Sequence, residues 1–403
     1  CGYSAYSFNR GLRNPKGVLT RRLCVSVDGA ADGYSPIRSA DPLDPIPFWF
    51  IAGCKGPESG AFPEHLSGGT LIMALPPLWK VRRELDRIRV KTVLFTGRTF
   101  HDPIRRPIYD LTSHWRQQVT RGALPLTDRV AVFVVFQPKG IAASILLTLD
   151  HLRRNGFSVL VVSNSPLQPD DLATLSRRAS VVLERPNVGY DFGAYRDGIR
   201  HLWSLNHDIS RLVLMNDSTW FPLRMGDDSL ARMEALDADL TGHIFKTEDE
   251  ARPENDHVES HLLMISGAFA ISREFRDFWS GFRMSDQRST TILVGEKGFT
   301  QMARRSGRRI GALMSREWLL DVLHGLDDAR LRTVLNHTLD SFRNRQPDAS
   351  RVRRAASAGQ PWREAYMDWT DASLRNSKAF LLSAAFVMPA LVYGGMGFAK
   401  KAK

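Results

Sequence analysis

Four short apolar runs, separated by stretches with helical spacing, constrain the fold of this chain more than any other feature. The runs are residues 129–136, 157–163, 180–184 and 211–215, and β-branched and other apolar residues dominate them. Continuous runs of this kind are typical of strands that are buried on both faces of a parallel sheet. The intervening stretches predict helices at 141–154, 172–178 and 195–205. Strands that alternate with helices indicate right-handed crossovers, and therefore an α/β fold with a mostly parallel sheet flanked by helices.

In such a sheet, ligands bind beyond the carboxyl ends of the strands, so the chemistry should lie in the loops that follow the four runs. The loop after the third run has the sequence RPNVGYDFGAYRDG, residues 185–198. Its glycines allow a close approach to a ligand or a positive φ. Polar residues directly before a helix, an arginine among them, favour a phosphorylated ligand at the helix N-terminus. The segment contains neither a Walker A loop nor a dinucleotide-binding fingerprint.

The fourth run ends in Asn216, Asp217 and Ser218. A carboxylate at the end of an apolar strand suits a metal-diphosphate site, because a hard divalent cation takes much of its oxygen shell from water and phosphate. The alternative is that these three residues form an Asx-turn or the N-cap of the next element.

The charge of the chain points to an anionic partner. Its 403 residues include 55 Lys and Arg against 43 Asp and Glu, a formal charge of +12. We expect no nucleic-acid partner, because the sequence has no helix-turn-helix, zinc-finger or RNP pattern. The chain has three cysteines, and residues 1–72 show no signal-peptide pattern. Both features favour a cytoplasmic location.

The chain divides into four zones. Residues 1–72 are rich in Gly, Pro, Ser and Asp, and we expect them to be disordered or to precede the native start at Met73. Residues 73–128 predict a basic amphipathic helix at 78–88, which lies on an anionic membrane or packs on the next domain, and then a linker over 96–128. Residues 129–345 form the α/β domain.

Residues 346–403 form a helical C-terminal extension. Its uncharged stretch, 379–399, is long enough to span a bilayer. Pro389 and three glycines within it favour a buried helix followed by a loop, and contact with the membrane surface is a third alternative. The last lysines, Lys400, Lys401 and Lys403, are expected on a solvated surface or against anionic lipid.

Three segments resemble the rhamnan synthesis protein F family, whose members are similar to GT-A nucleotide-sugar glycosyltransferases. They are NVGYDFGAYRDG at 187–198, LMNDS at 214–218 and HVESH at 257–261, and the resemblance runs from residue 129 to at least 309. It implies a GT-A-like, Rossmann-type fold and a glycosyltransferase that helps assemble a cell-surface polysaccharide. The implied donor is a nucleotide-sugar of the dTDP-rhamnose type, and the implied acceptor is a glycan on a polyprenyl diphosphate. Both are anionic.

The resemblance also assigns roles to residues on the donor side. Asp217 matches the D-x-D metal motif, which implies a divalent cation, Mg²⁺ or Mn²⁺, whereas Asn216 and Ser218 here flank a single acid where that motif has two. Arg196 could carry part of the diphosphate charge instead. The implied donor-binding residues are Asn187, Gly189, Asp191 and Arg196 in the glycine-bearing segment, Ser163 and Asn164 after the second run, and Asn216 and Ser218.

An inverting transfer needs a carboxylate base for the acceptor hydroxyl. Residues 295–307 resemble the acceptor-side helix of the family, which makes Glu296 the candidate base, with Lys297 where a second acid is expected. The alternative for Glu296 is a helix-start residue that the macrodipole favours. Asp256 and Glu259 are second candidates, and His257 and His261 flank Glu259 either as metal ligands or as ordinary surface or acceptor-contacting residues.

The missing acids leave a second functional class open. Asn216, Ser218 and Lys297 occupy positions where the resemblance leads us to expect carboxylates. A non-catalytic module that keeps the fold in order to bind a sugar nucleotide, or to help assemble the polysaccharide machinery, is therefore the alternative to an enzyme.

Overall fold

The structure is a computed structural model. It describes residues 102–247, 253–282, 284–285, 287–342, 352–354, 357, 361–376 and 384–401. All of these residues lie within the compact unit Thr70–Lys401. The expected disorder of residues 1–72 and the expected helix at 78–88 fall outside the described residues.

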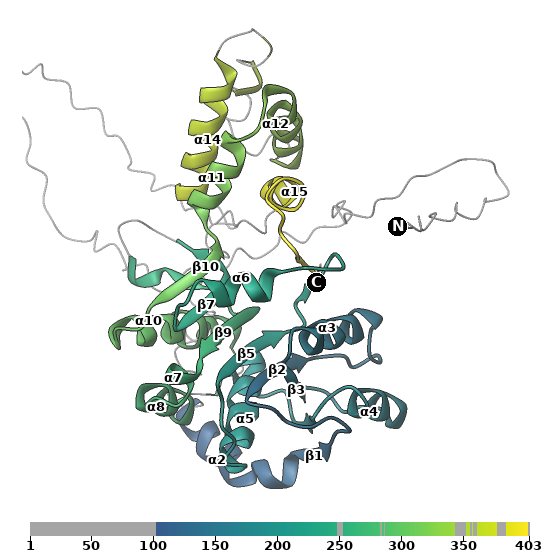
Figure 1. The fold of residues 1–403 in the computed structure, drawn as a ribbon. Helices are drawn as coiled ribbons and strands as arrows, with labels where there is room; N and C mark the ends of the chain where they lie inside the picture. Colours follow the sequence, from purple (N-terminus) through teal and green to yellow (C-terminus); the bar gives the residue numbers. More distant parts are fainter. Residues whose placement is uncertain are drawn as a thin grey trace, which may run out of the picture. The chain divides into compact units, whose positions relative to one another are not determined.

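A single large sheet organises the described part of the chain (Figure 1). Its order is β1 (Gln118–Arg121), β4 (Val181–Glu184), β3 (Ser158–Ser163), β2 (Arg129–Val135), β5 (Arg211–Asn216), β9 (Leu262–Ser266), β7 (Leu240–Lys246) and β10 (Ile310–Met314), and β8 (His257–Val258) also pairs with β7. The neighbours β4, β3, β2 and β5 are parallel, as are β7 and β10. By contrast, β1, β8 and β9 are antiparallel to their neighbours. The expected α/β fold with a mostly parallel sheet is confirmed.

Strand β2 lies where the strand order reverses. The chain adds β3 and then β4 on one side of β2, and later returns to add β5 on the other side. Val135 is paired with Ser163, and Val134 is paired with Asn216, so the loops after the three strands begin next to one another. The crevice beyond the carboxyl ends of the strands at such a reversal is where open α/β sheets bind ligands.

Helices on both faces of the sheet explain why the apolar runs are continuous. Ala131, Phe133 and Val135 enter one buried cluster, together with Leu149 of α3. The alternate residues of β2, Val130, Val132 and Val134, enter a second cluster with residues of α5. Because successive strand residues point to opposite faces, both layers need apolar side chains.

The connecting helices lie close to the expected positions, but two begin earlier. They are α3 (Ala143–Arg154), α4 (Pro169–Ser176) and α5 (Tyr190–Ser204). Gly189 precedes α5 with a φ of 76°, a conformation that glycine adopts at little cost. The early start of α5 moves Asp191 from the expected loop into the first turn of the helix, and Arg196, expected in the first turn, into the second.

The prediction that residues 96–128 form an irregular linker is wrong for much of that range. Residues 102–116 form α2 (Asp102–Arg116), and residues 118–121 form β1, which pairs with β4. Pro103 lies in the first turn, where proline is tolerated, whereas Pro107 lies inside the helix, so the prolines did not exclude this helix. Tyr109 of α2 is only 3% exposed and belongs to the core.

The remaining described helices follow β5. They are α6 (Ser229–Ala235), a 3-10 turn (Pro253–Asn255), α7 (Gly267–Ala270), α8 (Arg273–Gly281), α9 (Arg288–Thr291), a π-helix (Ile292–Lys297), α10 (Gly298–Arg305), α11 (Arg316–His324), α12 (Asp328–Phe342), α14 (Trp362–Asn376) and α15 (Ala384–Val392). The C-terminal extension is thus helical in its described part. No helix among the described residues is long and apolar enough to cross a membrane.

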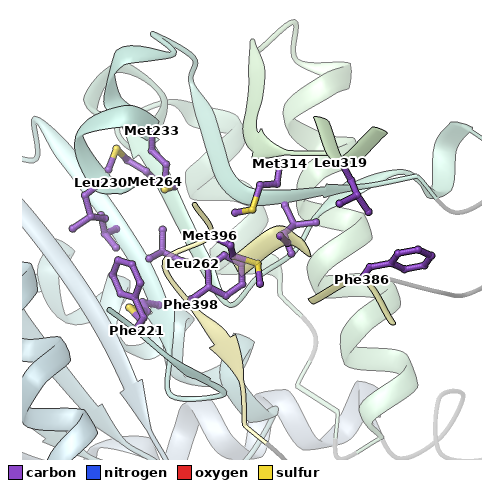
Figure 2. Packing of buried hydrophobic residues seen from close by; sticks show 14 of the residues in the cluster. Phe221, Leu230, Met233, Leu262, Met264, Met314, Leu319, Phe386, Met396 and Phe398 are labelled. Carbon is purple, nitrogen blue, oxygen red and sulfur yellow. The ribbon is translucent and has the colours of Figure 1, made fainter. Parts of the chain in front are cut away.

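The end of the described chain returns to the sheet. After α15, Met396 and Phe398 lie among Phe221, Leu262 and other buried side chains (Figure 2). Strand β11 (Ala399–Lys400) then pairs with β6 (Thr219–Trp220) in a separate two-stranded sheet. In the described part of 379–399, a helix followed by a loop packs against the core. This arrangement agrees with the alternative of a buried helix and loop.

Candidate functional site

The carboxylate of Asp217 lies at the point where the strand order reverses. Its Oδ2 atom accepts a hydrogen bond from the backbone N–H of Phe136 at 3.1 Å and from Nε2 of Gln137 at 2.6 Å. Both donors follow β2, the strand beside β5. The side chain is half-buried. Asp217 is therefore held by the neighbouring loop at the carboxyl end of the sheet, as the sequence led us to expect.

Asn216 links this strand end to helix α5. Its Nδ2 donates to Oδ2 of Asp191 at 2.9 Å, and its Oδ1 accepts from the backbone N–H of Ser218 at 3.0 Å. The second contact is an Asx-turn, so this alternative is correct for Asn216. This Asx-turn is compatible with a ligand site, because it leaves the Asp217 side chain directed toward the loop after β2.

Helix α5 places two residues of the candidate site on one of its faces. Asp191 and Tyr195 are four residues apart, which brings side chains together on a helix. Tyr195 is fully buried and donates its hydroxyl to the backbone oxygen of Ser260 at 2.9 Å. Burial raises the pKa of Tyr195 well above its usual value of 10.0, and the negative charges of Asp191, Glu296 and Asp217 raise it further. Ser260 contacts both Tyr195 and Glu296, and Asn216, next to Asp217, contacts Asp191.

The sequence reasoning missed Tyr195. The signal was present, because Tyr195 follows Asp191 by one helical turn. However, the expected start of the helix at residue 195 concealed the shared face.

Glu296 lies within a helix and not at its start. The π-helix Ile292–Lys297 continues into α10, so the helix-start alternative for Glu296 is wrong. Oε1 of Glu296 accepts from both the hydroxyl and the backbone N–H of Ser260, the latter at 3.4 Å. Its Oε2 lies 3.8 Å from Nε2 of His257, and 22% of the side chain is exposed. A Cβ at Gly295 would lie 2.7 Å from the Phe192 ring, so this glycine lets the π-helix approach α5.

Glu259 belongs to a buried chain of polar side chains behind this site. Its Oε2 lies 3.6 Å from Nδ1 of His261, whose Nε2 is 3.2 Å from Nδ1 of His243. Burial favours the neutral acid, but the hydrogen bond and charge of His261 and the charges of Lys400 and Lys246 outweigh it and lower the pKa of Glu259. Burial lowers the pKa of His243 well below 6.5, so this imidazole is neutral.

The two histidines that flank Glu259 do not converge. His261 faces His243, whereas Nδ1 of His257 lies 2.8 Å from the backbone oxygen of Asn255. Both are buried, so the expectation of surface histidines is wrong. Asp256 lies in the turn before β8, and its backbone oxygen contacts Nε2 of Gln301 at 3.5 Å.

Several expected donor-binding residues have structural contacts instead. Arg196 is 1% exposed, with Nη2 2.7 Å from Asp110 and Nε donating to the backbone oxygen of Trp279. Ser163 is fully buried and donates to the backbone oxygen of Ser165, and Asn164 accepts from Nη1 of Arg185 at 2.6 Å. A diphosphate or nucleoside cannot reach these three groups without displacing buried partners. We therefore leave them out of the site.

The glycines of the 185–198 segment pack the chain against itself. A Cβ at Gly193 would lie 2.1 Å from the backbone oxygen of Val188, and one at Gly189 would lie 2.7 Å from Sδ of Met284. Both glycines therefore have a packing role that the expectation of a ligand contact did not foresee. Asn187, in the same loop, is exposed.

Lys401 is a site residue that the sequence did not indicate. Its backbone N–H donates to the backbone oxygen of Ser218 at 2.9 Å, next to Asp217. Burial lowers the pKa of the Lys401 ammonium, and the charge of Asp217 opposes that shift. Lys401 is half-buried and Lys400 is exposed. Only the tertiary fold brings these residues together.

A separate hollow of about 510 Å³ opens beside the π-helix. Its lining residues are Glu254, Asn255, Leu293, Lys297, Gly298, Gln301, Met302 and Arg305. Lys297, which stands where the resemblance led us to expect a second acid, faces this hollow, whereas its neighbour Glu296 contacts Ser260.

The groups around Asp217 fit a divalent cation poorly. Oδ2 of Asp217 already accepts two hydrogen bonds, and the residues on either side of it, Asn216 and Ser218, carry no carboxylate. Within the described ranges, no three His, Cys, Asp or Glu side chains are grouped so that they could hold a metal ion. The expected Mg²⁺ or Mn²⁺ is therefore not carried into the proposed mechanism.

Comparison with known proteins supports the resemblance seen in the sequence. Residues 159–323 match the family model of rhamnan synthesis protein F. The uncharacterized protein y4gN of Sinorhizobium fredii is 29% identical over 263 residues, which are 65% of this chain and 68% of that protein. The matched family range includes Asp191, Asp217 and Glu296.

A solved structure was also found. The mannosyltransferase PcManGT from Pyrobaculum calidifontis, in complex with GDP-Man and Mn²⁺, is 16% identical. The alignment covers 76% of this chain and 86% of that chain, with a TM-score of 0.29. A likeness at that score supports no conclusion about this chain.

Proposed function

We propose that this chain is a glycosyltransferase that moves a sugar from a nucleotide-sugar donor to a growing cell-surface polysaccharide of the rhamnan type. The observation that carries the proposal is a set of contacts beyond the strand ends where the strand order reverses. Asn216, next to Asp217, contacts Asp191, and Ser260 contacts both Tyr195 and Glu296. These residues lie in the range that matches the rhamnan synthesis protein F model, which supports the choice of a sugar-transfer reaction.

The donor would bind at the ends of β2 and β5. Half-buried Asp191 and Asp217 offer carboxylate oxygens to sugar and ribose hydroxyls, and Asn216 holds Asp191 in place at 2.9 Å. Asn187 and Ser218 lie on the neighbouring loops. The family match favours a donor of the dTDP-rhamnose type.

The acceptor would enter on the side of Glu296. Ser260 holds Oε1 of this carboxylate, which orients the group as a base. As the acceptor oxygen attacks the anomeric carbon, its proton passes to Glu296, and the bond from that carbon to the diphosphate oxygen breaks with its electron pair on the diphosphate. Asp256 stays a second candidate, and Glu259 ranks behind Glu296 because it is 8% exposed and its Oε2 faces His261 at 3.6 Å.

The proposed acceptor is a glycan on a polyprenyl diphosphate. The net charge of +12 favours an anionic acceptor and an anionic membrane surface. We therefore propose that the protein works in the cytoplasm at the inner face of the membrane.

Substitution of the proposed base tests this function. Glu296→Gln keeps the shape of the side chain and removes the base, so the transfer rate should fall about 10²- to 10⁴-fold while donor affinity stays within about threefold. Glu364→Gln, an exposed acid on α14, is the matched control and should transfer at the wild-type rate. Transfer by Glu296→Gln within threefold of wild type would remove Glu296 from the mechanism.

A screen of nucleotide-sugar binding distinguishes a glycosyltransferase from a non-catalytic module. A ligand that binds the native state raises the melting temperature, so nucleotide-sugars can be compared by thermal shift. A shift with dTDP-rhamnose together with sugar transfer to a polyprenyl-linked glycan supports the enzyme. A shift without transfer to any acceptor glycan tested supports the non-catalytic module, for which Asn216, Ser218 and Lys297 are the sequence arguments.

A further inference from the structure

The last described residues are fixed against the strand ends by close packing. Phe398 stacks on His243 with ring centroids 4.3 Å apart and an interplanar angle of 10°. The backbone oxygen of Gly397 accepts from the N–H of Leu223 at 2.8 Å, and a Cβ at Gly397 would lie 1.8 Å from Oδ2 of Asp227. This segment therefore has a defined position beside β6 and not the mobility of a solvated tail.

The packing brings the backbone of two lysines next to the residues that follow β5. Lys400 pairs with Thr219 in the β6–β11 ladder, and its charge lowers the pKa of Glu259. Lys401 follows, half-buried, and its backbone N–H donates at 2.9 Å to the backbone oxygen of Ser218, the residue after Asp217. Burial lowers the pKa of the Lys401 ammonium, and the charge of Asp217 opposes that shift. A partly desolvated cation attracts an anion more strongly than an exposed one, because water screens it less.

The surroundings of Asp217 suit an ammonium better than a metal ion. A divalent cation needs several oxygen ligands, and Mg²⁺ requires near-octahedral geometry. Oδ2 of Asp217 already accepts from the Phe136 N–H and the Gln137 amide, and the flanking Asn216 and Ser218 add no second carboxylate that could hold a metal. An ammonium is a compact point charge with rotatable donors, and one carboxylate is enough to orient it.

We propose that Lys401 supplies the positive charge that binds the diphosphate of the donor, in place of a divalent cation, and that Asp217 positions Lys401. This inference rests on the proposed function. When the anomeric carbon leaves the diphosphate oxygen, the electron pair of that bond stays on the diphosphate, and the ammonium stabilises the charge that develops. The acceptor proton goes to Glu296, so the step balances without a metal.

Binding of dTDP to the full chain tests this inference, with affinity measured by calorimetry. Removal of divalent cations with EDTA should leave the dissociation constant of wild type unchanged within about twofold. Lys401→Met should weaken binding about 10- to 100-fold, because it removes a charge-assisted contact, and Lys401→Arg should restore most of the affinity. Arg177→Met removes one exposed positive charge at the opposite edge of the sheet and should bind dTDP like wild type.

The positioning role of Asp217 has its own readout. If Asp217 acts through Lys401, Asp217→Asn weakens dTDP binding in the wild-type background and causes no further loss in Lys401→Met. A further loss in the double variant would overturn the positioning role.

The outcomes distinguish this inference from the proposed function. Binding that EDTA abolishes and Mn²⁺ restores, or wild-type affinity in Lys401→Met, overturns the role of Lys401 and leaves the glycosyltransferase proposal standing. If wild type binds none of dTDP, UDP and GDP, with or without Mn²⁺, the proposed function falls and this inference falls with it.

Discussion

Two polar clusters flank helix α5, and they differ in how fully their hydrogen-bonding groups are used. We call the first the Arg185 cluster; its members are Arg185, Asp197, Tyr109, Gln117 and Asn164. Arg185 donates to Asp197, to the Asn164 side chain and to the backbone oxygen of Val188, each at 2.6 Å. Asp197 also accepts from Tyr109 at 2.6 Å and from Gln117 at 2.9 Å.

The second, the strand-end cluster, consists of Asp191, Asp217, Glu296, Ser260 and Lys401. Its three carboxylates are half-buried, whereas the side chains of Arg185 and Asp197 are 0% and 3% exposed. A fully satisfied buried network stabilises one conformation. Carboxylates that remain accessible at a strand edge keep acceptor capacity for a ligand. The 185–198 motif thus contributes Arg185 and Asp197 to a buried network and Asp191 to the proposed site.

The largest expected effect is the loss of the buried ion pair. Asp197→Ala leaves the Arg185 guanidinium buried without its carboxylate, so the free energy of unfolding should fall by about 3–5 kcal/mol. Denaturant titration at neutral pH measures the change. Asp277→Ala breaks the exposed Arg273–Asp277 pair and should cost only about 0.5 kcal/mol. A loss below about 1 kcal/mol for Asp197→Ala would show that the Arg185 cluster does not differ from a surface pair.

The stability of the protein at alkaline pH tests the Arg185 cluster a second time, through the buried phenol of Tyr109. Burial and then the charge of Asp197 raise the pKa of Tyr109 from 10.0 to about 12. Above pH 10 the unfolded chain loses this proton while the folded protein keeps it, so stability falls as pH rises to about 12. The two pKa units amount to at most about 2.7 kcal/mol. The stability of Tyr109→Phe should fall less over this interval, and equal slopes for the two proteins would contradict the assignment.

The smallest effect on stability is expected in the strand-end cluster. Asp191→Asn should change the free energy of unfolding by about 1 kcal/mol or less, because Asn216 is the partner that it affects. Affinity for dTDP-rhamnose should fall about tenfold, since a charged acceptor becomes a neutral amide. Asp208→Asn, at an exposed position beyond α5, should change neither quantity. A large loss of stability with unchanged affinity for dTDP-rhamnose would show that Asp191 has a structural role, as the Arg185 cluster does.

The parallel strands and the edge that carries the site were predictable from sequence. The apolar runs predicted β2, β3, β4 and β5 to within one or two residues, because a strand buried on both faces must be apolar at every position. The carboxyl-end rule then predicted Asp191 and Asp217 at one edge, and in the structure Asn216, next to Asp217, contacts Asp191. The family resemblance added Glu296, which no local pattern singled out.

The roles of neighbouring residues on α5 were not predictable. Arg196 and Tyr195 are adjacent in sequence, but about 100° of helical rotation directs one toward Asp110 and the other toward the strand ends. Which of them reaches the site depends on where the helix begins. That start depends on Gly189 and on the close contact between Gly193 and Val188, neither of which sequence periodicity reveals.

Sequence by itself determined the layered sheet, its buried strands and the edge at which a ligand can bind, because backbone geometry imposes its period on nearby side chains. Tertiary structure alone decided which charges meet at that edge. Lys401 lies near Asp217 because Phe398 packs on His243 and β11 pairs with β6. Contacts between segments so distant in the chain depend on shape complementarity in the core, and no local pattern encodes that.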